Sequence, residues 1–266
     1  MGPLRLYLKS IVMNMRIRMQ YPLSFFMQTL AQLVMEGGEM LAVILIVDRF
    51  DTLDRWSGGD LYFFFGMMSI TFYLTEFLGR GVTGTFPSIV RSGQLDTLLL
   101  RPRGVLTQVL CSDADPRRIV CVAVGTAALC MGSAASHVRW TFLKALALGE
   151  AILCGMLLIL GLFLIEAVFC IFSVKSVELV NALTYGGRSA CQYPVDIFPR
   201  PLRTLFTAAV PFALTLQIPA SFILDKPLFP WPEWTVFVCP LSGAAVFFAM
   251  AEVFRMALKR YRSTGS

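Results

Sequence analysis

The stretch FLKALALGEAILCGMLLILGLFLIEAVFCIF, residues 142–172, decides the fold class of this chain. Its charged residues are Lys144, Glu150 and Glu166, and the rest is almost wholly apolar. At the roughly 1.5 Å rise per residue of an α-helix, such a segment is long enough to cross the roughly 30 Å hydrocarbon core of a bilayer. The stretch therefore predicts a membrane-spanning helix.

The rest of the chain repeats this pattern. Of its 266 residues 56% are hydrophobic and 15% are charged, whereas soluble domains carry about 25% charged residues. No polar stretch is long enough to fold separately, so we expect one all-α integral membrane domain over residues 1–266. The other clear spans are predicted at residues 23–47, 61–82, 119–135 and 235–255.

The N-terminal segment, residues 3–20, has the pattern of a helix that lies in the membrane interface. Apolar residues recur at steps of three and four, while basic residues occupy another face. The apolar set is Leu4, Leu8, Ile11, Met15 and Met19, and the basic set is Arg5, Lys9 and Arg16.

Charge asymmetry predicts the orientation of the chain. Residues 1–20 contain four basic residues and no acidic one, whereas residues 48–60 contain four acidic residues against two basic ones. Basic residues favour the cytoplasmic side of a membrane. The last span is followed by a basic end that contains Arg255, Lys259, Arg260 and Arg262. We therefore expect six crossings with both termini in the cytoplasm.

Two interpretations compete for the fifth crossing. Hydropathy favours a span at residues 202–224, but prolines fall in and before it at spacings that break helices. The other interpretation places a short span at residues 177–192, followed by two half-helices between residues 194 and 224 that enter the outer leaflet and return. The prolines are Pro194, Pro199, Pro201, Pro211 and Pro219.

Catalytic and nucleotide-binding motifs are absent from the sequence. No G-x-x-x-x-G-K-[ST] P-loop occurs, so energy for transport would come from outside the chain. One histidine, His137, and the lack of a Cys/His pair or a metal-ligand cluster argue against a metal site and against an intramembrane enzyme. A secondary transporter driven by an ion gradient is a further alternative, although no inverted repeat supports it. The G-x-G-x-x-G at residues 79–84 closes a predicted membrane helix and is structural.

A short amphipathic segment, residues 93–101, separates the second and third predicted spans. Gln94, Asp96, Thr97 and Arg101 lie there among Leu95, Leu98, Leu99 and Leu100, so one face can be buried while the other stays in water. From chemistry alone, this segment either packs on the underside of its own membrane domain or docks into a groove of a separate ATPase.

Two motifs resemble a known family. IVRSGQLDTLLLRP, residues 89–102, is similar to the signature that follows the second span in permease subunits of ABC exporters of the second type (ABC-2). YPVDIFPRPLRTLFTAAVPFALTLQIP, residues 193–219, is similar to the proline-marked outer segment of the same family. The resemblance covers nearly the whole chain.

The resemblance implies a division of labour among subunits. It implies two ATP-binding subunits that carry ATP and Mg²⁺, a second permease subunit, identical or related, and a location in the inner (plasma) membrane. The basic residues lie beside apolar spans and form no long run, so membrane lipid and no nucleic acid is expected as a further partner. It also implies a coupling helix within residues 84–104 and re-entrant helices within residues 194–224 that include Pro194, Pro199 and Pro211. The ATPase contacts it implies are Gly93, Leu95, Asp96, Leu98, Leu99 and Arg101.

Acidic residues inside the predicted spans are candidates for a substrate path. A carboxylate left charged against lipid is costly, so we expect these side chains to face protein or water. They would either line a path that prefers cationic or amphipathic cargo, or pair with arginine or lysine of the partner subunit, lie near an interface or stay protonated. The candidates are Glu36, Glu39, Glu76 and Glu166.

Overall fold

The structure, a computed structural model, describes residues 3–50, 52–53, 55–172, 177–226 and 231–261; Arg262 of the basic end lies outside them. A short antiparallel hairpin of β1 (Thr52–Leu53) and β2 (Trp56–Ser57) follows the first long helix. The α-helices are α1 (Pro3–Met19), α2 (Pro22–Phe50), α3 (Gly58–Arg80), α4 (Phe86–Arg91), α5 (Leu95–Leu99), α6 (Val105–Leu110), α7 (Arg118–Ala135), α8 (Phe142–Phe172), α9 (Val177–Cys191), α10 (Arg200–Thr204), α11 (Ile218–Ile223), α12 (Thr235–Val238) and α13 (Leu241–Arg260).

Five helical stretches are long and apolar enough to cross a membrane, which confirms an all-α integral membrane fold. They are Pro22–Val47, Gly58–Arg91, Arg118–Ala135, Phe142–Phe172 and Thr235–Arg260. The expected span at residues 142–172 coincides with α8. The second stretch is longer than its prediction because a π-helical turn, Gly81–Thr85, joins α3 directly to α4.

The region between α8 and α13 contains a short helix and a bent pair of helices. α9 has 15 residues and is therefore about 22 Å long, less than a bilayer core. Residues 202–224 are not one straight helix, because the pieces Arg200–Ala209 and Ala213–Ile223 meet at 82°. Pro199 precedes α10, and Pro211 lies at the bend. The arrangement follows the proline pattern and not the hydropathy.

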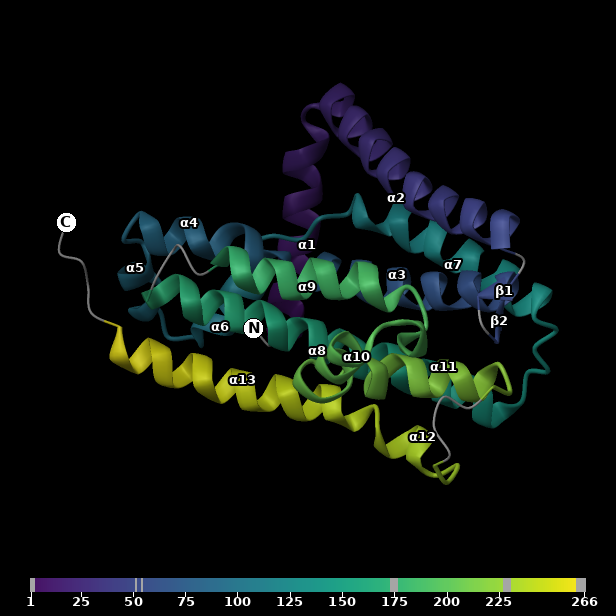
Figure 1. Ribbon diagram of the computed structural model, residues 1–266. Coiled ribbons are helices and arrows are strands. Elements are labelled where there is room, and N and C mark those ends of the chain that lie inside the picture. Colours follow the sequence, from purple (N-terminus) through teal and green to yellow (C-terminus); the bar gives the residue numbers. More distant parts are fainter. Residues whose placement is uncertain (1–2, 51, 54, 173–176, 227–230, 262–266) are drawn as a thin grey trace.

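The helices form a bundle around α8, with its two ends marked by different elements (Figure 1). α3 and α13 pack on α8, α7 packs on α3, and α2 lies on the outer side of α7. The hairpin, α11 and α12 lie at one end, which we call the hairpin end, while α4 and α5 lie at the other, which we call the α5 end. α1 runs across the long direction of the bundle, as an interfacial helix would.

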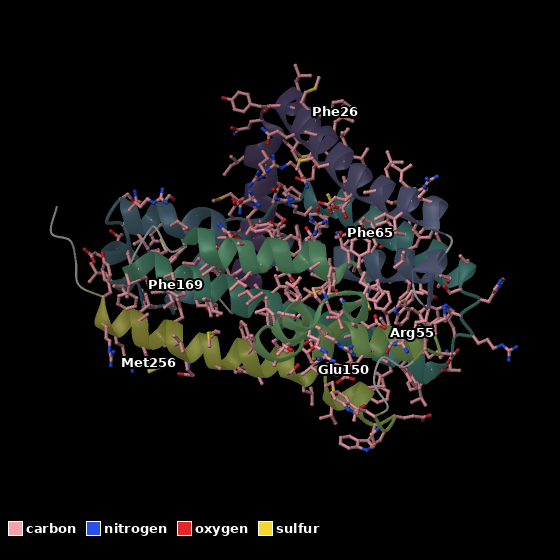
Figure 2. All side chains as sticks on the ribbon, viewed as in Figure 1. Phe26, Arg55, Phe65, Glu150, Phe169 and Met256 are labelled. Carbon is pink, nitrogen blue, oxygen red and sulfur yellow. The ribbon has the colours of Figure 1, made fainter. Side chains whose placement is uncertain are left out.

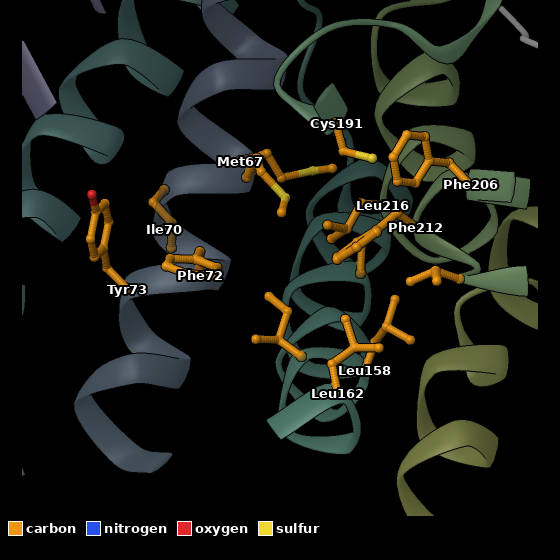
Figure 3. Packing of buried hydrophobic residues seen from close by; sticks show 14 of the residues in the cluster. Met67, Ile70, Phe72, Tyr73, Leu158, Leu162, Cys191, Phe206, Phe212 and Leu216 are labelled. Carbon is orange, nitrogen blue, oxygen red and sulfur yellow. The ribbon is translucent and has the colours of Figure 1, made fainter. Parts of the chain in front are cut away.

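The apolar core joins α3, α8 and the bent pair. Met67 and Phe72 of α3 face Leu158 and Leu162 of α8, and Phe212 closes the cluster from the bend (Figure 3). Each of these five side chains is at most 3% exposed. Apolar side chains at the bend therefore pack the bent pair against the bundle.

Glycines allow α3 and α7 to approach until their backbones touch. A Cβ on Gly66 would lie 2.4 Å from the Leu129 nitrogen, and a Cβ on Gly132 would lie 2.4 Å from the Phe63 nitrogen. Small residues commonly permit such close packing of membrane helices, where dispersion and not the hydrophobic effect drives association. The contact between α3 and α7 therefore depends on these positions having no side chain.

We expect Gly66→Ala to destabilise the protein by about 1–3 kcal/mol, because the added methyl group must displace backbone atoms of α7. Thermal unfolding of the detergent-solubilised protein, followed by circular dichroism, measures the effect. Gly149→Ala in α8 is the matched control, since a Cβ there meets nothing within 4 Å. Equal melting temperatures for the two variants would contradict the predicted clash.

Candidate functional site

The first candidate site is the segment between α4 and α6, residues 92–104, which we call the knob. Gly93 lies in the left-handed region at φ 70°, which L-residues with side chains adopt at a cost. The Gln94 amide donates to the Ile89 carbonyl at 3.0 Å, so the chain reverses at the end of α4 and enters α5. Gln108 then donates to the carbonyl oxygens of Leu98 at 3.0 Å and Arg103 at 2.8 Å, which fixes the far side of the turn.

The knob presents only some of its leucines to the surface. Leu99 is 42% exposed and Leu100 is 86% exposed, whereas Leu95 is 0% exposed. The expectation that Leu95 touches a partner and not its own chain is wrong, because Leu95 belongs to the buried cluster that includes Phe86 and Val109. Leu95 in the first turn of α5 anchors the knob, and Leu99, Leu100 and Arg101 belong to its exposed surface.

A groove of about 680 Å³ lies between α1 and the knob. Residues of the interfacial helix form one wall, and residues of the knob and α6 form the other. The lining residues are Ser10, Met13, Ile89, Leu98, Arg101, Pro102, Arg103, Gln108, Cys111 and Ser112. The groove is open and mostly apolar, with arginines along one wall, so an amphipathic helix of a partner fits its chemistry.

The second candidate site is an ion cluster between α2 and α9. The Arg188 guanidinium, 8% exposed, donates to Glu36 Oε2 at 2.8 Å and to Glu39 Oε2 at 2.7 Å. It also lies over the rings of Phe72 and Tyr73, with 5.0 Å and 4.8 Å to the ring centroids. One cation therefore faces two carboxylates, and the cluster keeps one formal negative charge.

Polar neighbours complete this cluster. Ser69 donates to Glu36 Oε1 at 2.7 Å, and the Tyr73 hydroxyl donates to Glu36 Oε2. Gln192 donates to Glu39 Oε2 at 3.0 Å. Glu36 is 0% exposed, whereas the Glu39 side chain is 37% exposed. Of the four predicted path residues, Glu39 is the one whose carboxylate reaches the surface of this chain.

A third group of charges lies toward the α5 end, around Asp115. Arg117 donates to Asp115 through Nε and Nη2, both at 2.7 Å, and Arg18 of α1 pairs with Asp113 at 2.6 Å. Burial by itself would raise the pKa of Asp115. The hydrogen bonds and charge of Arg117, with the charges of Arg18 and Arg118, outweigh burial and hold that pKa below its ordinary value.

Glu76 and Glu166 occupy different surroundings. Arg118 Nη1 lies 3.0 Å from Glu76 Oε2, and the Tyr185 hydroxyl of α9 donates to Glu76 Oε1 at 3.1 Å. Glu166 is 3% exposed, and its Oε2 has no hydrogen-bond partner among the described residues. This chain thus supplies a counter-charge to each of Glu36, Glu39 and Glu76.

Ion pairs at the hairpin end hold both ends of the bent pair. The Trp56 indole and the Arg55 guanidinium contact Asp196 at 3.0 Å and 3.1 Å, just before α10. After α11, Lys226 pairs with Asp60 at 2.5 Å. Lys144 of α8, buried, donates to the Ile223 carbonyl and to Asp225, both at 2.8 Å. The segment is therefore fastened at each end to elements earlier in the chain.

Several of these residues were not found from the sequence. Arg188 lies in residues 177–192, which are shorter and more polar than an ordinary span. That polarity could have indicated the ion cluster, because a cation among apolar residues needs a counter-charge and another span contains two acidic residues. Asp115 and Asp225 lie in loops, where no periodicity marks a paired charge. The predicted re-entrant segment has prolines at the start of its helical pieces or at its bend; these are Pro194, Pro199 and Pro211. Their side chains have no hydrogen-bonding group with which to bind a ligand.

The fold and the sites define the class of protein: a multi-pass helical membrane protein with an exposed loop helix beside an interfacial helix. Comparison with protein families gives the finer assignment. The family model of the ABC-2 family transporter proteins matches residues 33–265. The chain belongs to this family of permeases, which generally work with ATP-binding subunits. Searches of curated proteins and of solved structures found no match.

We expect Arg188→Leu to destabilise the protein by about 3–5 kcal/mol, because it leaves two carboxylates without their buried counter-ion. Thermal unfolding in detergent measures the loss. Arg255→Leu is the control, since that ion pair with Glu252 is mostly exposed, at 68% and 63%, and is worth about 0–1 kcal/mol. Adding Glu36→Gln and Glu39→Gln to Arg188→Leu should recover part of the stability. An Arg188→Leu protein that melts like the wild type would refute the cluster.

Proposed function

We propose that this chain is the permease subunit of an ATP-driven exporter. Two ATP-binding subunits carry ATP and Mg²⁺, and a second permease subunit, identical or related, completes the membrane part. The protein lies in the plasma membrane, with the α5 end and both termini on the cytoplasmic side. ATP-driven movement of the motor subunits is transmitted to the spans by the knob, and the spans alternate between inward and outward access.

The knob is the observation that carries this proposal. A membrane protein exposes a large apolar side chain such as Leu100 to water at a free-energy cost, and its 86% exposure fits a surface that a partner covers. The adjoining groove is formed by α1 and the knob together, so one partner helix would touch both. The sequence has no P-loop of its own, which fits a motor on another chain.

The continuous helix Gly58–Arg91 supports transmission from the knob into the membrane. α3 and α4 are joined through a π-helical turn without an intervening loop, so a push on α4 acts directly on a span. Leu95 fastens the knob to the bundle core. Because the knob is short and anchored to the core, a movement of the bound partner would be transmitted to the spans.

The substrate path, in this proposal, runs along the face where Glu39 is exposed. The cluster of Glu36, Glu39 and Arg188 keeps one formal negative charge, and the exposed carboxylate belongs to Glu39. A path beside it favours cationic or amphipathic cargo.

We expect Leu100→Asp to lower co-purification of the ATPase about tenfold or more without changing the melting temperature. Placing a carboxylate in an apolar contact costs well over the roughly 1.4 kcal/mol that corresponds to tenfold. Gln20→Asp, on an exposed residue after α1, adds the same charge away from the knob and should leave the complex intact. Undiminished ATPase recovery with Leu100→Asp would reject the knob as the contact.

Leu95→Ala should have the opposite effects to Leu100→Asp: a loss of stability without a loss of ATPase binding. Because Leu95 is fully buried, its truncation should cost about 2–5 kcal/mol of stability by leaving a cavity. ATPase recovery per folded permease should be retained. Circular dichroism for stability and subunit ratios from gel filtration separate the two effects, and a stable Leu95→Ala protein would contradict the buried position.

For the path, we expect Glu39→Gln in proteoliposomes of the whole complex to reduce ATP-dependent transport of a cationic fluorescent amphiphile more than that of its neutral analogue. Removal of the carboxylate charge removes its attraction for the cation. Glu36→Gln serves as the comparison, since that carboxylate is buried against Arg188. If both variants transport every cargo like the wild type, the assignment of the path to this face fails.

A further inference from the structure

One buried amide, that of Gln217, holds the end of α9 against the second piece of the bent pair. Gln217 is 1% exposed, and its Oε1 accepts a hydrogen bond from the Val195 amide at 2.8 Å. Its Nε2 donates to the Tyr193 carbonyl at 2.8 Å and to the Cys191 carbonyl at 3.3 Å. A single side chain thus satisfies three backbone groups of the turn at the end of α9, residues 191–195.

Apolar packing joins the same two elements. Gly187 of α9 makes room for two rings of the bent pair, because a Cβ there would lie 2.8 Å from Cε2 of Phe212 and 3.4 Å from Cε1 of Phe206. Cys191, the last residue of α9, belongs to the same buried cluster as these rings (Figure 3). The end of α9 and the bent pair therefore form one packed unit, joined by hydrogen bonds and by apolar contacts.

Two residues of this unit reach across to α2. Arg188 donates to Glu39 Oε2 through Nη2 at 2.7 Å, and Gln192, which is 4% exposed, donates to the same oxygen at 3.0 Å. Arg188 directly follows Gly187, and Gln192 directly follows Cys191. The positions of both donors opposite Glu39 are therefore set by the contacts that the last turn of α9 makes with the bent pair.

From these contacts we propose that Gln217 is a positioning residue for the Glu39 carboxylate. Its hydrogen bonds fix the end of α9 on the bent pair, so that Arg188 and Gln192 stay within reach of Glu39. Without the Gln217 amide, three backbone groups of the turn would be buried without partners, which is costly, and the turn would have to shift. Gln217 thus acts on Glu39 through α9.

The bent pair thereby controls how much of the Glu39 charge a cargo meets. α2 packs chiefly on α7 and α3, so it does not follow a displacement of the bent pair, whereas the end of α9 does. Such a displacement draws Arg188 and Gln192 away from Glu39 and leaves the carboxylate without its counter-ion. This consequence rests on the proposed function, in which the path runs along Glu39: the charge is partly neutralised in the present arrangement and becomes available to a cation when the bent pair moves.

Labelling of Glu39 with dicyclohexylcarbodiimide in the detergent-purified full-length protein, measured by peptide mass spectrometry, tests the proposal. A carbodiimide adds to a protonated carboxyl, and a neighbouring guanidinium disfavours that form, so the labelling rate reports whether Arg188 is in place. The exposed Glu252, on the face of α13 that Met256 marks in Figure 2, is the internal reference. The assay needs neither cargo nor an ATPase, so a failure of this proposal can be told apart from a failure of the proposed function.

Gln217→Met is the diagnostic variant, since methionine has a similar length but no amide to bond the backbone of the turn. We expect the labelling of Glu39 relative to Glu252 to rise about tenfold, because a neighbouring cation changes the proton affinity of a carboxyl by that factor or more. Thr215→Val is the matched control, because it removes a buried hydroxyl that donates to the Pro211 carbonyl at 2.7 Å and leaves Gln217 in place. Unchanged labelling in a folded Gln217→Met protein, or an equal rise in Thr215→Val, would overturn the proposal.

A second pair of variants tests the same contact by another route. Gly187→Val pushes the end of α9 away from Phe212, whereas Gly186→Val adds the same side chain at an exposed position where a Cβ meets nothing within 4 Å. We expect Gly187→Val to raise the labelling of Glu39 and Gly186→Val to leave it unchanged. This pair decides the matter if Gln217→Met does not fold, and equal labelling of the two glycine variants would then refute the positioning role.

Discussion

The arrangement of the membrane part depends on one buried contact, the guanidinium of Arg188 between Glu36 and Glu39. Among the α2 side chains that the structure describes, only Glu36 and Val43 are buried, so α2 has little apolar packing against the bundle. The ion cluster ties the middle of this exposed helix to α9 and, through Ser69 and Tyr73, to α3. Without it, this mostly exposed helix would be held by its contacts with α7, α3, α1 and the hairpin.

Helices α3 and α9 take part both in the Arg188 cluster and in the contacts of Glu76. Tyr185 of α9 donates to Glu76 of α3, and Arg188, less than one turn further along α9, reaches α2. Toward the α5 end, Asp115 gathers arginines from α1, α3 and the start of α7. The short helix α9 therefore contacts a charged side chain of α3 directly, and α1 is linked to one through Asp115, in addition to the apolar contacts of α9 with the core.

The sequence predicted the parts of the fold that depend on length and hydropathy. α8 has the predicted bounds because an almost wholly apolar run of that length can cross the bilayer as one helix. The prolines predicted the bent pair, since each one removes a hydrogen bond that a straight helix needs. The face of α5 was not predictable: leucines at positions 95, 98 and 99, with Leu100 directly after the helix, leave no unique apolar stripe in five residues. Pairing of Arg188 with acids some 150 residues away leaves no local pattern.

That separation has a consequence for biosynthesis. Glu36 precedes Arg188 by 152 residues, and at about 5–20 residues per second the ribosome takes roughly 8–30 s to cover this interval. During that time α2 has two intramembrane carboxyls and no arginine to pair with them. The nascent α2 must stay at the protein-lined insertion machinery or keep its acids protonated until α9 emerges. The ion pair that ties α2 to α9 can therefore form only after most of the chain has been made.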